Sequence, residues 1–171
     1  MNDLTSPKYR VYQSNILVES SYKLIVDEKR LLLAGISQIN SEQEVPDKVS
    51  ITVDLYARLF GISIDSAYSQ VKNARRSLFE RKITFRNNDV EDDIRWVRRA
   101  TYHKGEGRVD LYFSNEIKPL LGQLKNKFTP YYLEAIDELH SFNAIRMYEL
   151  LAQFKDLKHR WMLLDLSLIH I

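Results

Sequence analysis

The sequence predicts an α+β fold in which a helix-turn-helix and an antiparallel β-hairpin are flanked by additional helices. Two observations carry this prediction. Residues 51–81 hold two helical segments on either side of a glycine. Residues 82–113 alternate apolar and polar side chains in three runs separated by turn residues, which is the pattern of half-buried strands. A helix pair followed by a β-hairpin is the winged-helix arrangement.

The helix-turn-helix has capping residues at its expected boundaries. The first helix is predicted over residues 53–59, with Thr52 as its N-cap, because a hydroxyl can accept from the free N–H groups of the first turn. Gly61 suits the positive φ at which a helix commonly ends. Ser63 is expected to cap the longer second helix.

The second helix is predicted to have two faces of opposite character. Its apolar residues recur at spacings of four, three and four, and they are Ala67, Val71, Ala74 and Leu78. The opposite face is polar and partly cationic, with Ser66, Ser69, Asn73, Arg76 and Glu80 on it and Lys72 and Gln70 on its flanks. A helix-turn-helix presents such a face to DNA, although the same pattern is typical of a solvated helix in an ordinary helical domain.

The segments before the helix pair have weaker signals. Residues 1–15 are expected to form an irregular arm, and residues 16–24 a short helix. Asp27 is the predicted N-cap of a helix that runs to about Ile39, and its apolar residues cover most of the circumference, so we expect burial on more than one side. Residues 49–53 are expected to be a strand.

Three strands are predicted after the helix pair, over residues 82–86, 94–102 and 108–113. Arg98 interrupts the apolar face of the middle run, which indicates an edge or a bulge. Residues 104–107 are expected to form a tight turn.

Three further helices are expected in the last part of the chain. One begins after Ser114 and ends near Gly122, one begins at Thr129 and runs to about Leu139, and one begins at Asn143. The residues expected on the buried face of the last helix are Met147, Leu150, Leu151 and Phe154. In the same helix, Arg146 and Glu149 can pair across one turn.

The formal net charge is only +2, but the cations gather on the second helix and on the strands after it. They are Lys72, Arg75, Arg76, Arg81, Lys82 and Arg86, followed by Arg95, Arg98, Arg99, Lys104 and Arg108. The tip of the first hairpin is acidic, with Asp89, Glu91, Asp92 and Asp93. Because phosphates repel carboxylates, we expect this tip to stay away from DNA. Arg95 and Arg99 are expected to face the DNA together with the second helix.

Several function classes find no support in the sequence. The chain has no cysteine, no signal peptide and no apolar run of about 18 residues, so we expect a cytoplasmic protein without a membrane span. The four histidines lack metal-site spacing, and we interpret the acidic cluster as a solvated loop. There is no phosphate-binding glycine loop and no GxSxG motif, so we expect no enzyme, no cofactor and no metal site.

A set of motifs recurs in the order and spacing of a known family. They are Gln13-Ser14-Asn15 with Leu17, Tyr22, Leu24 and Glu28; Tyr56-Ala57-Arg58-Leu59-Phe60-Gly61 with Ala67-Tyr68; Trp96-Val97, Gly105-Glu106-Gly107 and Phe113-Ser114; Leu121-Gly122-Gln123-Leu124-Lys125 with Phe128-Thr129; and Ser141, Ile145-Arg146 and Tyr148-Glu149-Leu150-Leu151. Over residues 12–156 the chain resembles the N-terminal winged-helix domain of iteron-binding plasmid replication initiators (Rep proteins). The resemblance implies an arm over residues 1–15, a winged-helix domain over 16–156, and a tail or linker stub over 157–171 that precedes a second winged-helix domain.

The resemblance also implies a mechanism. Dimers of such initiators bind an inverted operator repeat and repress their own gene, whereas monomers bind origin iterons and recruit the host initiator and helicase. The N-terminal domain mediates dimerisation and contacts DNA mainly through phosphates. The residues expected to bind DNA here are Ser66, Ser69, Lys72, Asn73 and Arg76, supported by Arg95 and Arg99.

Two alternatives remain open from the sequence. The chain could act only as a dimerisation module, with edge strands at residues 96–102 and 109–113 pairing across a two-fold axis. It could also be a winged-helix transcription regulator.

Overall fold

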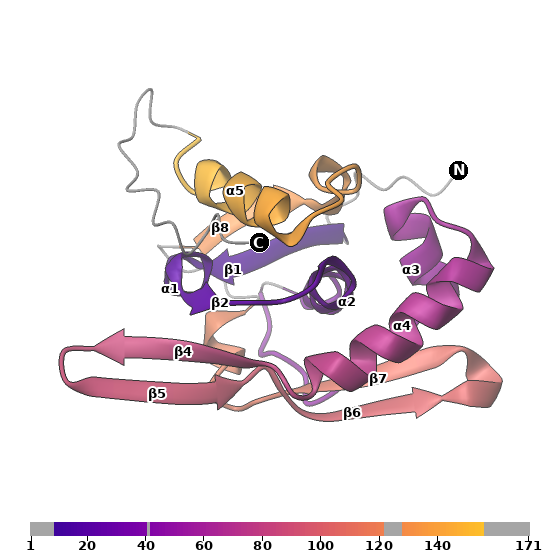
Figure 1. Ribbon diagram of the computed structural model, residues 1–171, viewed down its shortest axis with the longest axis horizontal. Helices are drawn as coiled ribbons and strands as arrows, with labels where there is room; N and C mark the ends of the chain where they lie inside the picture. Colours follow the sequence, from indigo (N-terminus) through magenta and orange to yellow (C-terminus); the bar gives the residue numbers. More distant parts are fainter. Residues whose placement is uncertain (1–8, 41, 122–127, 156–171) are drawn as a thin grey trace.

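The computed structural model describes residues 9–40, 42–121 and 128–155 and contains five α-helices in these ranges (Figure 1). The helices are α1 (Asn15–Glu19), α2 (Val26–Ile36), α3 (Val53–Phe60), α4 (Ile64–Leu78) and α5 (Phe142–Ala152). The strands are β1 (Arg10–Ser14), β2 (Ser21–Tyr22), β3 (Val49–Thr52), β4 (Lys82–Asn87), β5 (Val90–Arg95), β6 (Val97–His103), β7 (Arg108–Phe113) and β8 (Phe128–Tyr132).

The strands form three small antiparallel sheets, with the orders β1-β8, β2-β4-β5 and β3-β7-β6. The β4–β5 and β6–β7 hairpins extend in opposite directions along one side of the molecule, and α4 runs diagonally above β6 and β7 (Figure 1). A helix pair followed by a hairpin that packs beside its second helix confirms the predicted α+β winged-helix fold. We call the β6–β7 hairpin the wing.

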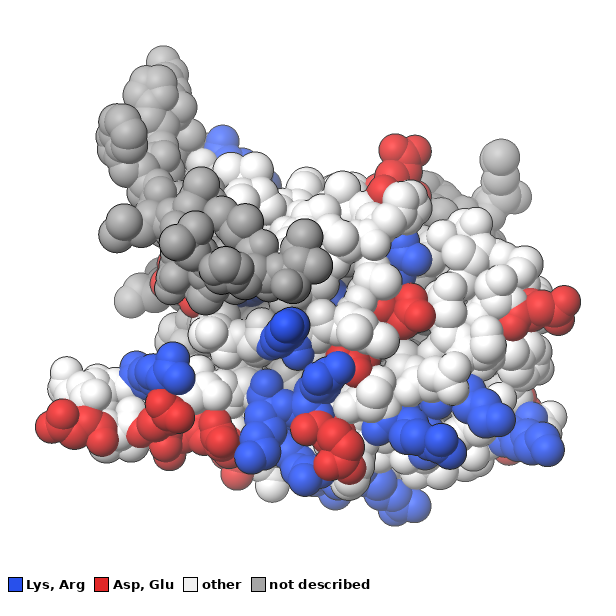
Figure 2. Space-filling model, viewed as in Figure 1, with Lys and Arg blue, Asp and Glu red and all other residues white. Residues whose placement is uncertain are grey.

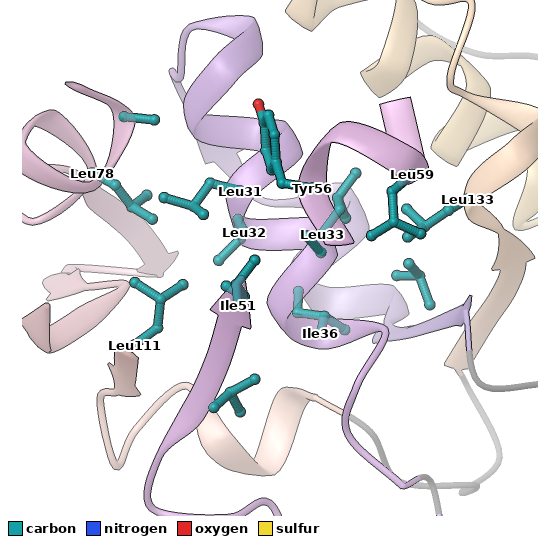
Figure 3. Close-up of a cluster of buried hydrophobic side chains, with 14 of the residues drawn as sticks. Leu31, Leu32, Leu33, Ile36, Ile51, Tyr56, Leu59, Leu78, Leu111 and Leu133 are labelled. Carbon is teal, nitrogen blue, oxygen red and sulfur yellow. The ribbon is translucent and has the colours of Figure 1, made fainter. Parts of the chain in front are cut away.

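Helix α2 lies in the centre of the hydrophobic core (Figure 3). Its side chains meet Ile51 and Leu111 of one sheet, Leu78 of α4, and Leu59 and Leu133 from the other side. Leu31, Leu32 and Leu33 are all fully buried, so consecutive positions around the helix are covered. This confirms the prediction that α2 is buried on more than one side.

The capping residues of the helix-turn-helix act as predicted. Leu55 donates its backbone N–H to Thr52 Oγ1 at 3.1 Å, and Ser66 donates its backbone N–H to Ser63 Oγ at 3.2 Å. Gly61 ends α3 in the left-handed conformation, with φ at 60°. The turn between the helices is therefore fixed by local chemistry.

The N-terminal expectations need correction. Within the expected arm, Arg10–Ser14 is the strand β1, paired along its length with β8. The expected helix over residues 16–24 is instead the short α1 followed by β2. Helix α2 begins at Val26 with Ile25 at its N-cap, because Glu28 reaches back and accepts the Ile25 backbone N–H at 2.9 Å. Asp27 therefore lies inside the first turn.

The expected helix from Thr129 to Leu139 is also wrong. Residues 128–132 form β8, with Pro130 opposite Tyr12, and only a short 3-10 turn (Leu133–Ala135) follows. After Ser114 the structure has a 3-10 turn (Lys118–Leu120) in place of a longer helix. The expected end of that helix at Gly122, the run 122–125 and the tail over 157–171 lie outside the described residues.

Helix α5 begins near the expected residue, but its buried side differs from the prediction. Ile145, Arg146 and Glu149 are buried, whereas Leu151 is 57% exposed and Met147, Leu150 and Phe154 are partly exposed. The buried side is polar because Arg146 and Glu149, which pair at 3.2 Å as expected, meet Lys29 in the interior.

The strand expected over residues 94–102 is divided at the buried Trp96 into β5 and β6, which belong to different sheets. The register shifts between Val97 and Arg99, which confirms a bulge at Arg98. Residues 109–113 lie in β7, between β3 and β6, so this strand has no free edge for pairing with a second copy.

Candidate nucleic-acid interface

The outward face of α4 is the centre of the candidate site. The predicted apolar stripe of Ala67, Val71, Ala74 and Leu78 is at most 1% exposed. Because this stripe holds α4 against the core, the residues on the other side of the helix point to solvent. Ser66, Ser69, Lys72, Asn73 and Arg76 are all exposed, so the structure brings these five predicted residues together on one surface.

The wing lies beside α4 and extends this surface. The ring of Tyr68 packs against Gly107 in the wing turn, and the Arg75 guanidinium lies 6.0 Å from the centre of the Tyr102 ring on β6. The turn itself is a single 3-10 turn (Lys104–Glu106), and Gly107 leaves it in the left-handed conformation. This arrangement places the exposed Lys104 at the end of the wing that α4 approaches.

Three cations of this surface are free of ion pairs among the described residues. In the described part of the chain, neither Lys72 nor Arg76 nor Lys104 has an ion-pair partner. Arg108, by contrast, is held by Glu106 at 2.8 Å and by Asp110. Blue side chains gather at the lower right of Figure 2, over α4 and the wing. Cations without intramolecular partners are available for an anionic ligand such as a phosphate backbone.

Arg95 lies next to this surface, at the C-terminal end of α4. It donates from Nη1 to the backbone carbonyl of Phe79 at 3.0 Å and pairs with Glu80 at 3.5 Å. The Arg95 side chain remains 43% exposed, so its guanidinium is still accessible to a ligand. Arg95 can therefore support the helix, but part of its charge is already compensated.

Arg99 lies on the other face of the wing sheet. Its neighbour Ala100 pairs with the buried Leu111 on the face that meets α4, whereas Arg99 pairs with Tyr112 on the opposite face. The Arg99 guanidinium lies 5.0 Å from the centre of the Tyr112 ring. The structure therefore does not bring Arg99 together with the other six predicted residues.

The β4–β5 hairpin carries most of its charge in cross-strand pairs. Arg86 pairs with Glu91 at 2.7 Å, and Lys82 pairs with Asp93 at 3.4 Å. A hydrogen bond from Thr84, with a second from Lys82, lowers the pKa of Asp93. Red side chains dominate the lower left of Figure 2, where this hairpin projects. The β4–β5 hairpin therefore offers no net attraction to an anionic ligand bound on α4.

Two residues of the surface are absent from the sequence-based set of DNA contacts. Tyr68 sits on the side of α4 that faces the wing, and Lys104 sits in the wing turn. The sequence indicates that Lys104 is exposed, because it stands at the start of the predicted turn over residues 104–107. Tyr68 had no such signal, because its neighbour Gly107 is distant in sequence.

Neither a metal site nor a membrane span is found in the described ranges. They contain no group of three or more histidine, aspartate or glutamate side chains placed to hold a metal ion. None of the helices described is long and apolar enough to cross a membrane.

The chain matches the model of a known protein family over most of its length. The model of the family described as "Initiator Replication protein, WH1" matches residues 10–152. The chain belongs to this family. Its matched region includes every helix and strand described above, so the whole fold is that of a WH1 domain.

Curated relatives of this WH1 domain come from Escherichia coli. A replication initiation protein is 33% identical over 145 residues, which cover 81% of the chain and 45% of the relative. The PI protein is 26% identical over 167 residues, which cover 84% of the chain and 55% of the relative. The WH1 domain thus spans about half the length of these two relatives.

A solved structure shows the same fold. The crystal structure of the Pi initiator protein in complex with iteron DNA superposes with a TM-score of 0.72 and 24% sequence identity, over 86% of this chain and 65% of that chain. The likeness confirms the winged-helix architecture of the WH1 domain.

Proposed function

We propose that this WH1 domain binds duplex DNA through the outward face of α4 and the wing, as one domain of a plasmid replication initiator. The observation that carries the proposal is the surface on which Lys72, Arg76 and Lys104 are exposed and lack ion-pair partners in the described residues. Support comes from the family and from the Pi initiator, which has the same fold and was solved in complex with iteron DNA.

The contacts are made mainly with phosphates. The Ser66 hydroxyl, the Asn73 amide and the cations of α4 donate hydrogen bonds to phosphate oxygens. The Ser69 hydroxyl, which donates to the Ser66 carbonyl at 3.0 Å in the free domain, turns to a phosphate on binding. Such contacts fix register without reading sequence. Arg95 assists from the end of the helix. Contacts of this kind give weak, salt-sensitive binding, with a Kd on the order of 10⁻⁴ to 10⁻⁶ M at physiological salt.

The proposal for the whole initiator follows the family. Its DNA targets are the origin iterons and an operator inverted repeat, and its protein partners are a second copy, the host initiator and the helicase. Its role is binding and recruitment in the cytoplasm, and it is not an enzyme.

Self-association is a second candidate function, because β6 is an edge strand of the wing sheet. The bulge at Arg98 disrupts the start of this edge, so pairing with a second copy would use residues 100–103. A two-fold axis there would extend the sheet across two protomers.

Sedimentation velocity of the chain, with and without a labelled duplex at low and moderate salt, tests both candidates. Binding at low salt that is lost as salt rises supports the phosphate contacts. A dimer that is indifferent to DNA at every salt concentration contradicts the DNA-binding proposal and favours self-association.

A further inference from the structure

Tyr68 and Gly107 form the contact that joins α4 to the wing turn. A Cβ atom built on Gly107 would lie 2.6 Å from the Tyr68 hydroxyl oxygen and 3.1 Å from Cζ, so the ring occupies the space that any side chain would need. Gly107 also has φ at 55°, which disfavours other residues. The positive φ therefore favours glycine at position 107, and any larger residue there would also displace the end of the Tyr68 side chain.

The same glycine is tied to the start of α3. The Gly107 carbonyl accepts the backbone N–H of Val53, the first residue of α3, at 2.8 Å. The wing turn is thus held on one side by α3 and on the other by Tyr68. Lys104 belongs to this turn, and Lys72 lies one helical turn after Tyr68 on α4.

We propose that Tyr68 is a positioning residue whose ring sets the distance between α4 and the wing, so that Lys72 and Lys104 reach backbone phosphates together. This inference rests on the DNA-binding function proposed above. The hydroxyl oxygen and the edge of the ring both lie against Gly107, and the hydroxyl has no hydrogen-bond partner in the described residues. The ring is 41% exposed, so it is a spacer at the surface and contributes little to the core.

The salt dependence of DNA binding separates this role from a general loss of stability. Each phosphate contact contributes about 0.9 to the slope of log K against log salt concentration. Lys104→Ala is expected to lower the slope by about that amount with a mixed-sequence duplex. Tyr68→Ala, which removes no charge, is expected to lower it equally, whereas Tyr68→Phe keeps the wild-type slope.

A double-mutant cycle sharpens the test. Once Tyr68→Ala has released the wing, adding Lys104→Ala is expected to change neither affinity nor slope. Additive effects of the two substitutions overturn the proposal. A loss in Tyr68→Phe as large as that in Tyr68→Ala also overturns it, because the ring would then not be what sets the distance.

Amide hydrogen exchange provides a readout that needs no DNA. Tyr68→Ala is expected to speed exchange of the Val53 amide, because the wing turn that accepts its hydrogen bond becomes loose, and Tyr68→Phe is expected to leave it protected. If the alanine variant is unstable, Tyr68→Leu can replace it. The leucine side chain is too short to reach Gly107, so this variant is also expected to speed exchange of the Val53 amide. Unchanged Val53 protection in both variants overturns the positioning role.

The two proposals fail in distinguishable ways. If Lys72→Ala with Arg76→Ala leaves DNA binding unchanged, α4 is not the contact, so the proposed interface is wrong and the positioning role falls with it. If those substitutions weaken binding but the cycle is additive, only the positioning role is wrong.

Discussion

Lys29 Nζ lies 2.8 Å from Glu149 Oε1, and both side chains are fully buried. The pair joins α2 to α5. The Glu149 carboxylate also accepts from the Tyr131 hydroxyl at 2.6 Å, from Gln13 Nε2 at 2.8 Å and from Arg146. Side chains of α2, β1 and β8 therefore donate to one carboxylate of α5, so Glu149 holds this helix against the core.

Glu149→Gln is expected to destabilise the domain strongly. Removing one member of a buried ion pair leaves Lys29 and Arg146 without their counter-charge, and such losses cost about 3–5 kcal/mol. The free energy of unfolding from urea titrations measures the change. Glu91→Gln is the matched control, because its partner Arg86 is 67% exposed and ion pairs at the surface contribute little to stability. Equal effects of the two variants would contradict the anchoring role.

The same carboxylate predicts a loss of stability in acid. Burial favours a raised pKa for Glu149, but Lys29 and Arg146 outweigh it and hold the pKa below the ordinary value of 4.5. A lowered pKa in the folded state stabilises the fold above pH 4.5, and this stabilisation disappears as the pH falls through the folded pKa. Urea titrations across this range are expected to show a steeper acid loss for the wild type than for Glu149→Gln. If the free energy of unfolding fell with pH equally in both proteins, the titration of Glu149 would not be the cause of the acid loss.

Lys72→Ala with Arg76→Ala is expected to weaken duplex binding without unfolding the domain, since neither residue lies on the buried stripe of α4. The expected loss is roughly tenfold at low salt, which corresponds to about 1.4 kcal/mol. Fluorescence anisotropy with a labelled duplex measures it. Arg86→Ala removes the same kind of charge from the β4–β5 hairpin and should leave affinity nearly unchanged. A normal fold with unchanged binding in the double variant would exclude α4 as the contact.

Arg99 and Arg76 provide a second comparison, because they lie on surfaces that face different directions. Arg99→Ala is expected to weaken DNA binding much less than Arg76→Ala, since Arg99 packs beside Tyr112 on the far face of the wing sheet. The same anisotropy titration distinguishes them. A larger loss for Arg99→Ala would place the DNA on that far face.

Gly61→Ala is expected to destabilise the domain by about 1–2 kcal/mol, the cost of a left-handed backbone for a residue with a Cβ. No atom lies within 4 Å of the added methyl group, so backbone strain is the whole effect. Gly61→Asn should cost less, because asparagine tolerates this conformation. The Tm values from thermal melts of the two variants test this. A lower Tm for Gly61→Asn than for Gly61→Ala would contradict the explanation.

The helix-turn-helix could be predicted from the sequence because its determinants are local. Thr52, Gly61 and Ser63 each act within one turn of themselves, and the apolar stripe of α4 follows helical spacing. Strand β8 could not be predicted in this way. Thr129-Pro130 has the local signature of a helix start, but pairing with β1, far earlier in the chain, determines the structure there.

The candidate site was predictable on the helix and less so on the strands. The cations of α4 follow from its two-faced pattern. Arg95 and Arg99 share one alternating run in the sequence, but the break at Trp96 assigns them to different sheets and the bulge at Arg98 resets the alternation. A similar limit applies to α5, where the sequence favours burial of Leu151 over Glu149 because nothing local reveals the donors from other elements.

Amide chemical-shift mapping of the isotopically labelled chain, titrated with a duplex, tests the central claim most directly. The account predicts that the largest shifts fall on residues 66–76 of α4 and on residues 104–107 of the wing turn, and that they fade as salt is raised. Shifts confined to the β4–β5 hairpin or to the Tyr112 face of the wing sheet, with α4 unaffected, would contradict it.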